Sequence, residues 1–313
     1  MKKTIFFSVL LLGAGGCVKN TIPGDSNTNL EAIETLADYQ IPVQAGKAAI
    51  VTLGEDTLAV TREAMTARVP RYALQQGLIK VTYSDEEIYA RFASMEYWQY
   101  LGFEDTRSAD YDYNDIVFHV RLRCDKIYGQ EMWNNSIDIQ PVALGSSTPI
   151  KIGILYTETA GGAPVSKILV EDARKELFNG DPRFPINTDP NKEIKQVSRK
   201  LTNFFRNTSS IPLRVVWFIE ANGVRLYAAT SAGDKNSLEM VSKDGLPYGL
   251  SMTKKWEYPI EKASIDKAYP GFRQWLKTGD ETTLLSGKND AYAFPACRPV
   301  PGVNGSLWDY EKY

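Results

Sequence analysis

Short runs in which hydrophobic and polar residues alternate dominate the chain from residue 41 onward, and they predict a mainly β protein. In residues 116–122 the apolar side chains alternate with Val117, His119 and Arg121, which is the period of a half-buried strand. The predicted strands in the first half of the chain cover residues 41–61 (two strands, separated by Gly54-Glu55-Asp56), 78–83, 116–122, 136–142 and 149–156.

A β-hairpin is predicted around Asn222-Gly223. Residues 213–220 and 224–230 on either side are rich in β-branched and aromatic residues. Asn-Gly between two such runs is the strongest short-range signal for a hairpin, because both residues tolerate the positive φ angles of the tightest turns.

Two segments have helical spacing. The first is residues 166–178, with Ser166 as a candidate cap and a stop at Asn179-Gly180. The second begins at Asp189-Pro190 and carries apolar residues three or four apart as far as Phe204, with a basic opposite face that is either solvated or in contact with lipid headgroups. The pattern as a whole predicts a jelly-roll-like β-sandwich with two or three inserted helices.

The N-terminus has the features of an export signal. Two lysines precede a short apolar run, small residues follow it, and Cys17 comes directly after them. Residues 1–16 are therefore predicted to be a lipoprotein signal peptide, with Cys17 as the lipidated first residue and residues 17–40 as a flexible tether. The alternative is an ordinary signal peptide with an incidental cysteine. A single β-rich body is expected at residues 41–313.

The predicted anchor defines the location. Val18 follows Cys17, in place of the Asp that commonly retains lipoproteins in the inner membrane, and this predicts a lipid-anchored protein of the outer membrane. The sequence leaves open whether the body faces the periplasm or the cell surface.

Composition narrows the function classes. A formal net charge of -2 argues against nucleic-acid binding, which requires a basic surface. His119 is the sole histidine, which disfavours histidine-based zinc sites and a catalytic triad. Cys124 and Cys297 either form a disulfide in the oxidising envelope or remain two buried thiols.

The stretch between residues 103 and 118 is the strongest candidate site. It holds five carboxylates and one asparagine within a dozen residues, between two apolar runs. A hard cation such as calcium binds several such oxygens at once. An EF-hand is excluded, because Asp115 occupies the position of its glycine and Arg121 that of its bidentate glutamate. Spacing alone leaves open a calcium site or a turn whose acids pair with arginines 107, 121 or 123. The candidate ligands are Glu104, Asp105, Asp110, Asp112, Asn114 and Asp115, of which Asp110, Asp112 and Asp115 are the strongest.

Two separated motifs resemble the LruC-domain family of bacterial outer-membrane lipoproteins. The first is GFED at residues 102–105 followed by DYDYNDIVF at 110–118. The second comprises LPY at 246–248, WEYPIEK at 256–262 and SIDKAYPGFRQW at 264–275. The resemblance covers about residues 97–279 and implies a β-rich domain of uncharacterised function. Related acidic-loop domains are regarded as calcium-binding. The family usually has a longer Gly/Pro-rich insertion than residues 106–109 of this chain.

Aromatic residues gather in the second motif. Exposed aromatics in exported proteins often stack on sugars, whereas aromatics at helical spacing more often pack in a core, and the second reading is favoured. The possible ligand-contact residues are Trp256, Tyr258, Tyr269 and Trp275.

The function predicted from the sequence is non-catalytic. We expect a lipid-anchored envelope protein with a calcium-stabilised domain that acts as an interaction module in adhesion, envelope assembly or glycan contact, with an unknown protein or glycan ligand. No nucleophile elbow or phosphate-binding loop occurs in the mature chain. The alternative is a carbohydrate-active enzyme that uses the acidic-loop carboxylates.

Overall fold

A computed structural model describes residues 35–107, 110–159, 161–192, 201–208, 212–228 and 246–294, together with the backbone of two short paired strands, β1 (Asn20–Thr21) and β2 (Asn29–Leu30). The predicted signal peptide and Cys17 lie outside the described residues. None of the described helices is long and apolar enough to cross a membrane.

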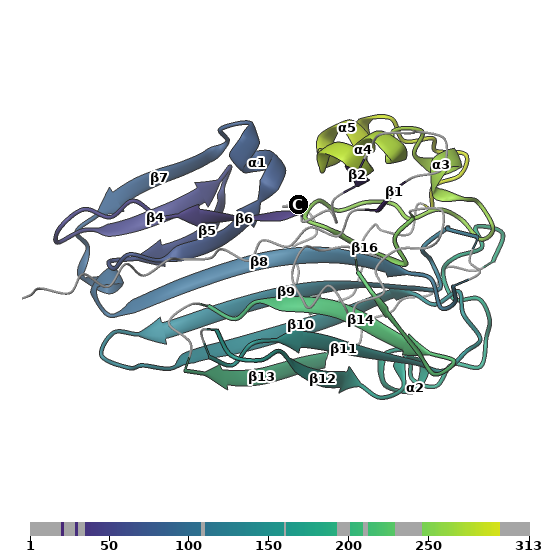
Figure 1. The fold of residues 1–313 in the computed structure, drawn as a ribbon, viewed down its shortest axis with the longest axis horizontal. Coiled ribbons are helices and arrows are strands. Elements are labelled where there is room, and N and C mark those ends of the chain that lie inside the picture. Colours follow the sequence, from purple (N-terminus) through teal and green to yellow (C-terminus); the bar gives the residue numbers. More distant parts are fainter. Residues whose placement is uncertain are drawn as a thin grey trace, which may run out of the picture.

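The main sheet contains eight antiparallel strands in the order β13-β10-β9-β8-β5-β4-β7, with β16 as a further partner of β8 (Figure 1). Most of these strands were predicted from the alternation of apolar and polar residues. Their bounds are β4 (Ala48–Leu53), β5 (Asp56–Thr61), β7 (Ile79–Ser84), β8 (Phe92–Phe103), β9 (Ile116–Ile127), β10 (Trp133–Ala143), β13 (Leu201–Asn207) and β16 (Gly249–Met252).

The long strand β8 changes partner along one edge. Its first half pairs with β5 at Met95 and Ser94, and its last four residues pair with β16 from Tyr100 to Phe103. Among the described residues, positions 96–99 have no strand partner on this side. The edge of β8 is therefore open between two elements that come from opposite ends of the chain.

A second, four-stranded sheet packs against one face of the main sheet, which makes the body a β-sandwich as predicted. In the core between the two sheets, the ring centroids of Phe118 and Trp217 lie 5.8 Å apart. The Trp217 indole nitrogen also donates a hydrogen bond to Oε1 of Gln99. The strands of this sheet, in spatial order, are β12 (Val165–Val170), β11 (Ile150–Tyr156), β14 (Val215–Ala221) and β15 (Val224–Tyr227).

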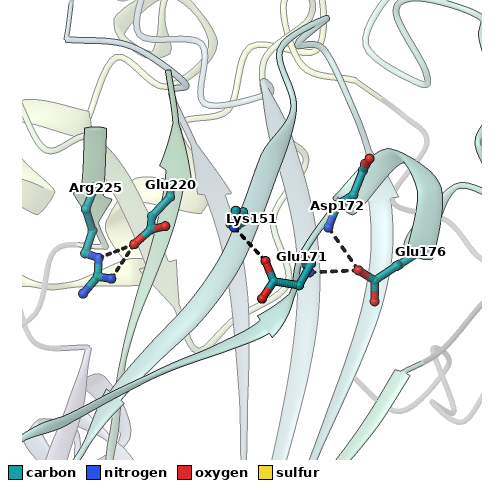
Figure 2. Close-up of polar contacts among 6 residues, drawn as sticks. All are labelled: Lys151, Glu171, Asp172, Glu176, Glu220 and Arg225. Carbon is teal, nitrogen blue, oxygen red and sulfur yellow. Dashed lines mark hydrogen bonds and ion pairs between the residues drawn. The ribbon is translucent and has the colours of Figure 1, made fainter. Parts of the chain in front are cut away.

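Ion pairs link β11 to the residue that follows β12, and β14 to β15, in the four-stranded sheet (Figure 2). Lys151 pairs with Glu171 at 2.7 Å, and Arg225 pairs with Glu220. The Glu176 carboxylate accepts from the backbone nitrogens of Glu171 and Asp172, at the start of helix α2 (Ala173–Leu177). Solvent-exposed pairs of this kind contribute little to stability.

Three short helices cover the other face of the main sheet at the acidic-loop end: α3 (Ile265–Ala268), α4 (Phe272–Thr278) and α5 (Glu281–Ser286). Their apolar residues form a second core with Tyr100, Val117 and Leu250. The first half of β9 is consequently buried on both faces, and its prediction as a half-buried strand was wrong there. The alternation of residues could not show that a distant segment would cover the second face.

A smaller pair of strands flanks the main sheet, β3 (Leu36–Gln40) with β6 (Thr66–Pro70), followed by helix α1 (Arg71–Gln75) and a short 3-10 helix at Glu87–Ala90. Residues 36–40 therefore belong to the folded body and not to the predicted tether, because β6 supplies a paired edge for them.

Both predicted helices needed correction. Residues 165–170 form β12 against β11, and the helix begins only at Ala173, with Asp172 as its cap. Residues 201–207 form β13 along the edge of β10, whereas residues 193–200 lie outside the described part of the chain. In both places the segment pairs with the edge of a neighbouring strand, and this pairing outweighs the helical preference that the spacing of its apolar residues indicated. The stop at Asn179-Gly180 is confirmed, since both residues have positive φ angles.

The Asn222-Gly223 hairpin is confirmed: it joins β14 to β15, and its two residues have φ angles of 51° and 74°. Cys124 carries a free thiol buried in the main core, and burial raises its pKa. Cys297, the other cysteine of the disulfide considered from the sequence, lies outside the described residues.

Candidate metal centre in the acidic loop

The acidic loop closes the pair formed by β8 and β9. Phe103 and Ile116 are register partners, so residues 104–115 connect two strands that lie side by side. Both strands are buried on both faces here, and the loop starts and ends in an apolar environment. Its polar side chains must therefore find partners within the loop or in the C-terminal segment that packs on it.

Two tyrosines turn the loop back on itself. Tyr111 and Tyr113 have φ angles of 57° and 53°, a left-handed conformation that is unfavourable for bulky side chains. Tyr113 is held there by tertiary contacts: its ring is buried near Phe272, and its hydroxyl donates to the carbonyl oxygen of Pro247 at 2.8 Å. The turn orients the Tyr113 backbone nitrogen toward the Glu104 carboxylate.

Glu104 is fully buried, at 0% exposure. Its Oε1 accepts from the Tyr113 backbone nitrogen at 2.6 Å, whereas Oε2 has no hydrogen-bond partner among the described residues. Burial raises the pKa of Glu104 well above its usual range, and the negative charges of Asp112 and Asp115 raise it further. A buried carboxylate oxygen without a partner is costly unless a positive charge compensates it.

Glu104, Asp110 and Asp112 converge. Each offers a carboxylate oxygen within 4.8 Å of the others. Asp112 is buried, at 2% exposure, and accepts from the backbone nitrogens of Lys262 at 2.8 Å and Asn114 at 3.3 Å. Burial raises the pKa of Asp112 to about 7, with the charge of Asp110 as the next cause. Asp110 is exposed, so the cluster reaches the surface on its side.

The other three predicted ligands have different partners. The Asp115 carboxylate accepts from the Asp105 backbone nitrogen at 2.7 Å, and burial together with the Asp105 charge raises the pKa of Asp115 to about 8. The Asp105 carboxylate accepts from the Ser146 hydroxyl, and the Asn114 amide donates to the Pro259 carbonyl oxygen at 3.0 Å. These contacts fasten the loop to its surroundings.

Two of the arginines considered as partners of the loop pair elsewhere. Arg121 binds Asp138, and Arg123 binds Asp125. Among the neighbouring charges, those of other carboxylates have the largest effect on the pKa values of Glu104 and Asp112, and they raise both.

The cluster suits a calcium ion. Calcium binds oxygen ligands at about 2.4 Å, so two oxygens that share one ion lie at most about 4.8 Å apart. The three carboxylates meet this limit, and the donor set consists only of oxygens, as a hard cation requires. Glu104, Asp110 and Asp112, all three among the predicted ligands, are the residues that would hold it.

The two sequence motifs meet at this loop. The Tyr111 carbonyl oxygen accepts from the Ile265 backbone nitrogen at 2.7 Å, which adds to the contacts that Asp112 and Asn114 make with the segment from Pro259 to Lys262. The acidic loop and the C-terminal motif therefore form one unit, although about 150 residues separate them in the sequence.

Two glycines allow this close approach, and sequence reasoning missed their role. A Cβ atom at Gly102 would lie 2.5 Å from the Tyr113 carbonyl oxygen and 2.9 Å from the Trp256 ring. A Cβ atom at Gly145 would lie 2.7 Å from two oxygens of Asn114. Only the tertiary contacts reveal these constraints, because neither glycine has a positive φ angle.

The four aromatics considered for ligand contact are buried, at 0–2% exposure, and belong to the second core. The Tyr258 hydroxyl donates to the Asn187 carbonyl oxygen, and the Tyr269 hydroxyl donates to that of Glu257, each at 2.6 Å. Their surfaces are occupied by the protein itself, so Trp256, Tyr258, Tyr269 and Trp275 present no face to a sugar, in agreement with the favoured core reading.

The protein is thus a β-sandwich in which the helical C-terminal segment packs on the acidic loop between β8 and β9 and is hydrogen-bonded to it. A family model described as a domain of unknown function (DUF4842) matches residues 224–284, which contain the C-terminal motif but not the acidic loop. The chain is thus similar to an uncharacterised domain over this segment. No curated protein matches it. A solved structure of a candidate lipoprotein from Bacteroides ovatus aligns with 80% of this chain and 93% of its own, at 11% sequence identity and a TM-score of 0.49.

Proposed function

We propose that this chain is a lipid-anchored outer-membrane protein of the LruC-domain type, in which one calcium ion stabilises the acidic loop of a non-catalytic interaction module. Cys17 would carry the lipid, and Glu104, Asp110 and Asp112 would hold the ion. The observation that carries the proposal is the buried Glu104 Oε2, which has no hydrogen-bond partner among the described residues and lies in a cluster of carboxylates.

The ion would act by offsetting negative charge. Glu104 follows directly on β8, and Asp112 contacts Lys262 in the segment before α3. A cation shared by these carboxylates would join the end of a central strand to the helical segment. Its role would thus be structural, and the interaction surface would lie elsewhere on the body.

Burial of the carboxylates favours this role over the catalytic alternative. Glycoside hydrolysis needs two carboxylates on either side of a bound sugar. Glu104 and Asp112 have 0% and 2% exposure and lie beneath the loop backbone and the C-terminal segment. A polysaccharide would reach them only after that segment had moved.

The test is thermal unfolding of the mature, unlipidated chain (Val18 onward) in excess chelator and then in calcium. A ligand that binds only the folded state stabilises it by about 2.7 kcal/mol at a hundredfold excess over its dissociation constant. For a chain of about 300 residues the midpoint should rise by about 4–5 °C. Magnesium should not reproduce the shift, because it demands a smaller and more regular octahedral shell.

Two variants separate the explanations. Glu104→Gln keeps the side-chain shape and removes the charge, so it should lose the calcium shift while remaining at least as stable as the wild type in chelator. Glu171→Gln, at an exposed carboxylate that pairs with Lys151 and not with the loop, is the matched control and should keep the shift. Asp112→Ala should lose stability that no amount of calcium restores.

An unchanged midpoint in calcium, together with no metal in the purified protein, would contradict the calcium site. Turnover of a polysaccharide that Asp112→Ala abolishes without loss of stability would instead establish the enzymatic alternative.

A further inference from the structure

A cleft of about 360 Å³ opens where β8 changes partner, in the size range of small-molecule sites. Glu96 and Trp98 line it from the stretch of β8 that has no neighbouring strand on that side among the described residues. One wall comes from β5 and α1, and the other comes from residues 253–255 and α5. The cleft is separate from the acidic loop and shares none of its carboxylates.

The β8 side of the cleft consists of a partly exposed tryptophan fixed by polar neighbours. The Trp98 indole nitrogen donates to Glu96 Oε1 at 3.1 Å, and the Arg121 guanidinium lies 5.5 Å from the ring centroid. Arg121 is itself held by the buried carboxylate of Asp138. No hydrogen bond from the described residues reaches the second oxygen of Glu96. The side of the cleft formed by β8 thus combines an oriented aromatic ring with a carboxylate that can accept further hydrogen bonds.

The walls are joined, so the cleft is formed before any ligand arrives. The Lys254 ammonium lies 4.1 Å from the centroid of the Tyr72 ring, which places a cation from one wall over an aromatic residue of the other. The same ammonium donates to the Thr282 hydroxyl of α5 at 3.0 Å. A preformed site avoids the free-energy cost of ordering side chains on binding.

The lining is balanced in charge and mixed in polarity. Two carboxylates, Asp56 and Glu96, are accompanied by two lysines, Lys254 and Lys255, so the cleft has no excess charge to attract an ionic ligand. The exposed Thr57 adds a hydroxyl group that both donates and accepts, whereas the hydroxyl groups of Tyr97 and Thr253 donate to the Leu213 carbonyl oxygen and to Glu281. The remaining surface is aromatic and aliphatic. A ligand with an apolar face and a rim of uncharged hydroxyl groups matches this combination.

We propose that this cleft binds a neutral glycan, with a sugar ring packed on Trp98 and its hydroxyl groups bonded to Glu96 and to the polar residues of the walls. The site is distinct from the buried aromatics of the second core. The proposal does not rest on calcium, since the two sites share no ligating residue, and it gives the interaction module a chemical class of ligand.

The test is isothermal titration of the mature, unlipidated chain with neutral hexasaccharides of glucose, mannose and xylose, and with oligogalacturonate as the charged comparison. At least one neutral oligosaccharide should bind with a dissociation constant below about 1 mM. Trp98→Ala should weaken that binding by at least about tenfold. Phe204→Ala is the matched control, because Phe204 is 78% exposed on β13, three strands away from β8; it should bind like the wild type.

A second variant covers the case in which Trp98→Ala is unfolded. Thr57 is exposed at the edge of the cleft, so Thr57→Arg should obstruct the space without disturbing the core and should abolish binding. Glu104→Gln should bind the sugar normally, which keeps this test apart from that of the calcium site.

Three outcomes would overturn the proposal. They are the absence of binding by every neutral oligosaccharide, binding of oligogalacturonate alone, and neutral-sugar binding that persists in folded Trp98→Ala or Thr57→Arg. The last result would place the sugar elsewhere on the protein.

Discussion

Replacement of Gly102 by alanine tests how tightly the acidic loop packs against the C-terminal segment. The added Cβ atom would lie 2.5 Å from the Tyr113 carbonyl oxygen and 2.9 Å from Cζ2 of Trp256. Neither neighbour is free to move. Tyr113 is buried with its hydroxyl bound to the Pro247 carbonyl oxygen, and Trp256 is buried in the second core.

The expected magnitude follows from two opposing contributions. Forcing an extra methyl group into a well-packed core typically costs 1–3 kcal/mol, and the immobile neighbours of Gly102 place this substitution near about 3 kcal/mol. Alanine also restricts the unfolded chain, which offsets up to about 1 kcal/mol. We therefore expect the free energy of unfolding to fall by about 2 kcal/mol and the midpoint by about 3 °C.

Circular dichroism melting in chelator measures this change without any contribution from metal. Gly287→Ala is the matched control, because a Cβ atom there comes no closer than 3.9 Å to another atom and its φ angle is an ordinary -93°. The control should be as stable as the wild type or slightly more so. Equal midpoints for the two variants would refute the claim that Gly102 is required by close packing.

Two further predictions concern buried charge. His119 is fully buried, and burial lowers its pKa to about 3; its single set of imidazole NMR signals should therefore not titrate between pH 8 and 5. Because the unfolded histidine gains its proton near pH 6.5, the contribution of His119 to stability should fall by up to about 1.4 kcal/mol per pH unit as the pH decreases from there toward 3. The measurement is the difference in pH dependence between the wild type and His119→Gln, since the raised pKa values of Asp112 and Asp115 act in the opposite direction in both proteins. A folded-state midpoint near 6.5 would contradict this. Asp138→Ala should lower the free energy of unfolding, measured in urea, by about 3 kcal/mol. It leaves Arg121 without its ion-pair partner, a carboxylate that is only 3% exposed. Lys151→Ala removes one partner of an exposed ion pair and should leave the free energy of unfolding unchanged. Equal losses of stability in Asp138→Ala and Lys151→Ala would show that burial does not determine how much an ion pair contributes.

Local sequence signals were sufficient where the structure depends on neighbouring residues. Asn222-Gly223 forms the predicted hairpin because the turn itself demands positive φ angles, which these two residues tolerate. The strands on either side of Gly54 and the strand that leaves the acidic loop also lie where the alternation of residues placed them.

Local signals failed where two structures were compatible with the same residues. The spacing of residues 166–170 and 201–204 fits a helix, yet both segments are strands. The edges of β11 and β10 were available for pairing, and a sequence does not show which edges remain unpaired. Likewise, the alternation in β9 could not reveal that helices from the far end of the chain bury its second face.

The candidate site divides in the same way. The sequence by itself determined that a loop rich in carboxylates would follow a buried strand, because residue composition and strand periodicity are local properties. Only the tertiary structure decided that Glu104 joins Asp110 and Asp112 while Asp115 turns toward Asp105, and that β8 leaves an edge open beside Trp98. Both outcomes depend on the packing of segments more than a hundred residues apart, and the free energy of such packing resides in contacts between distant residues that no single stretch of sequence contains.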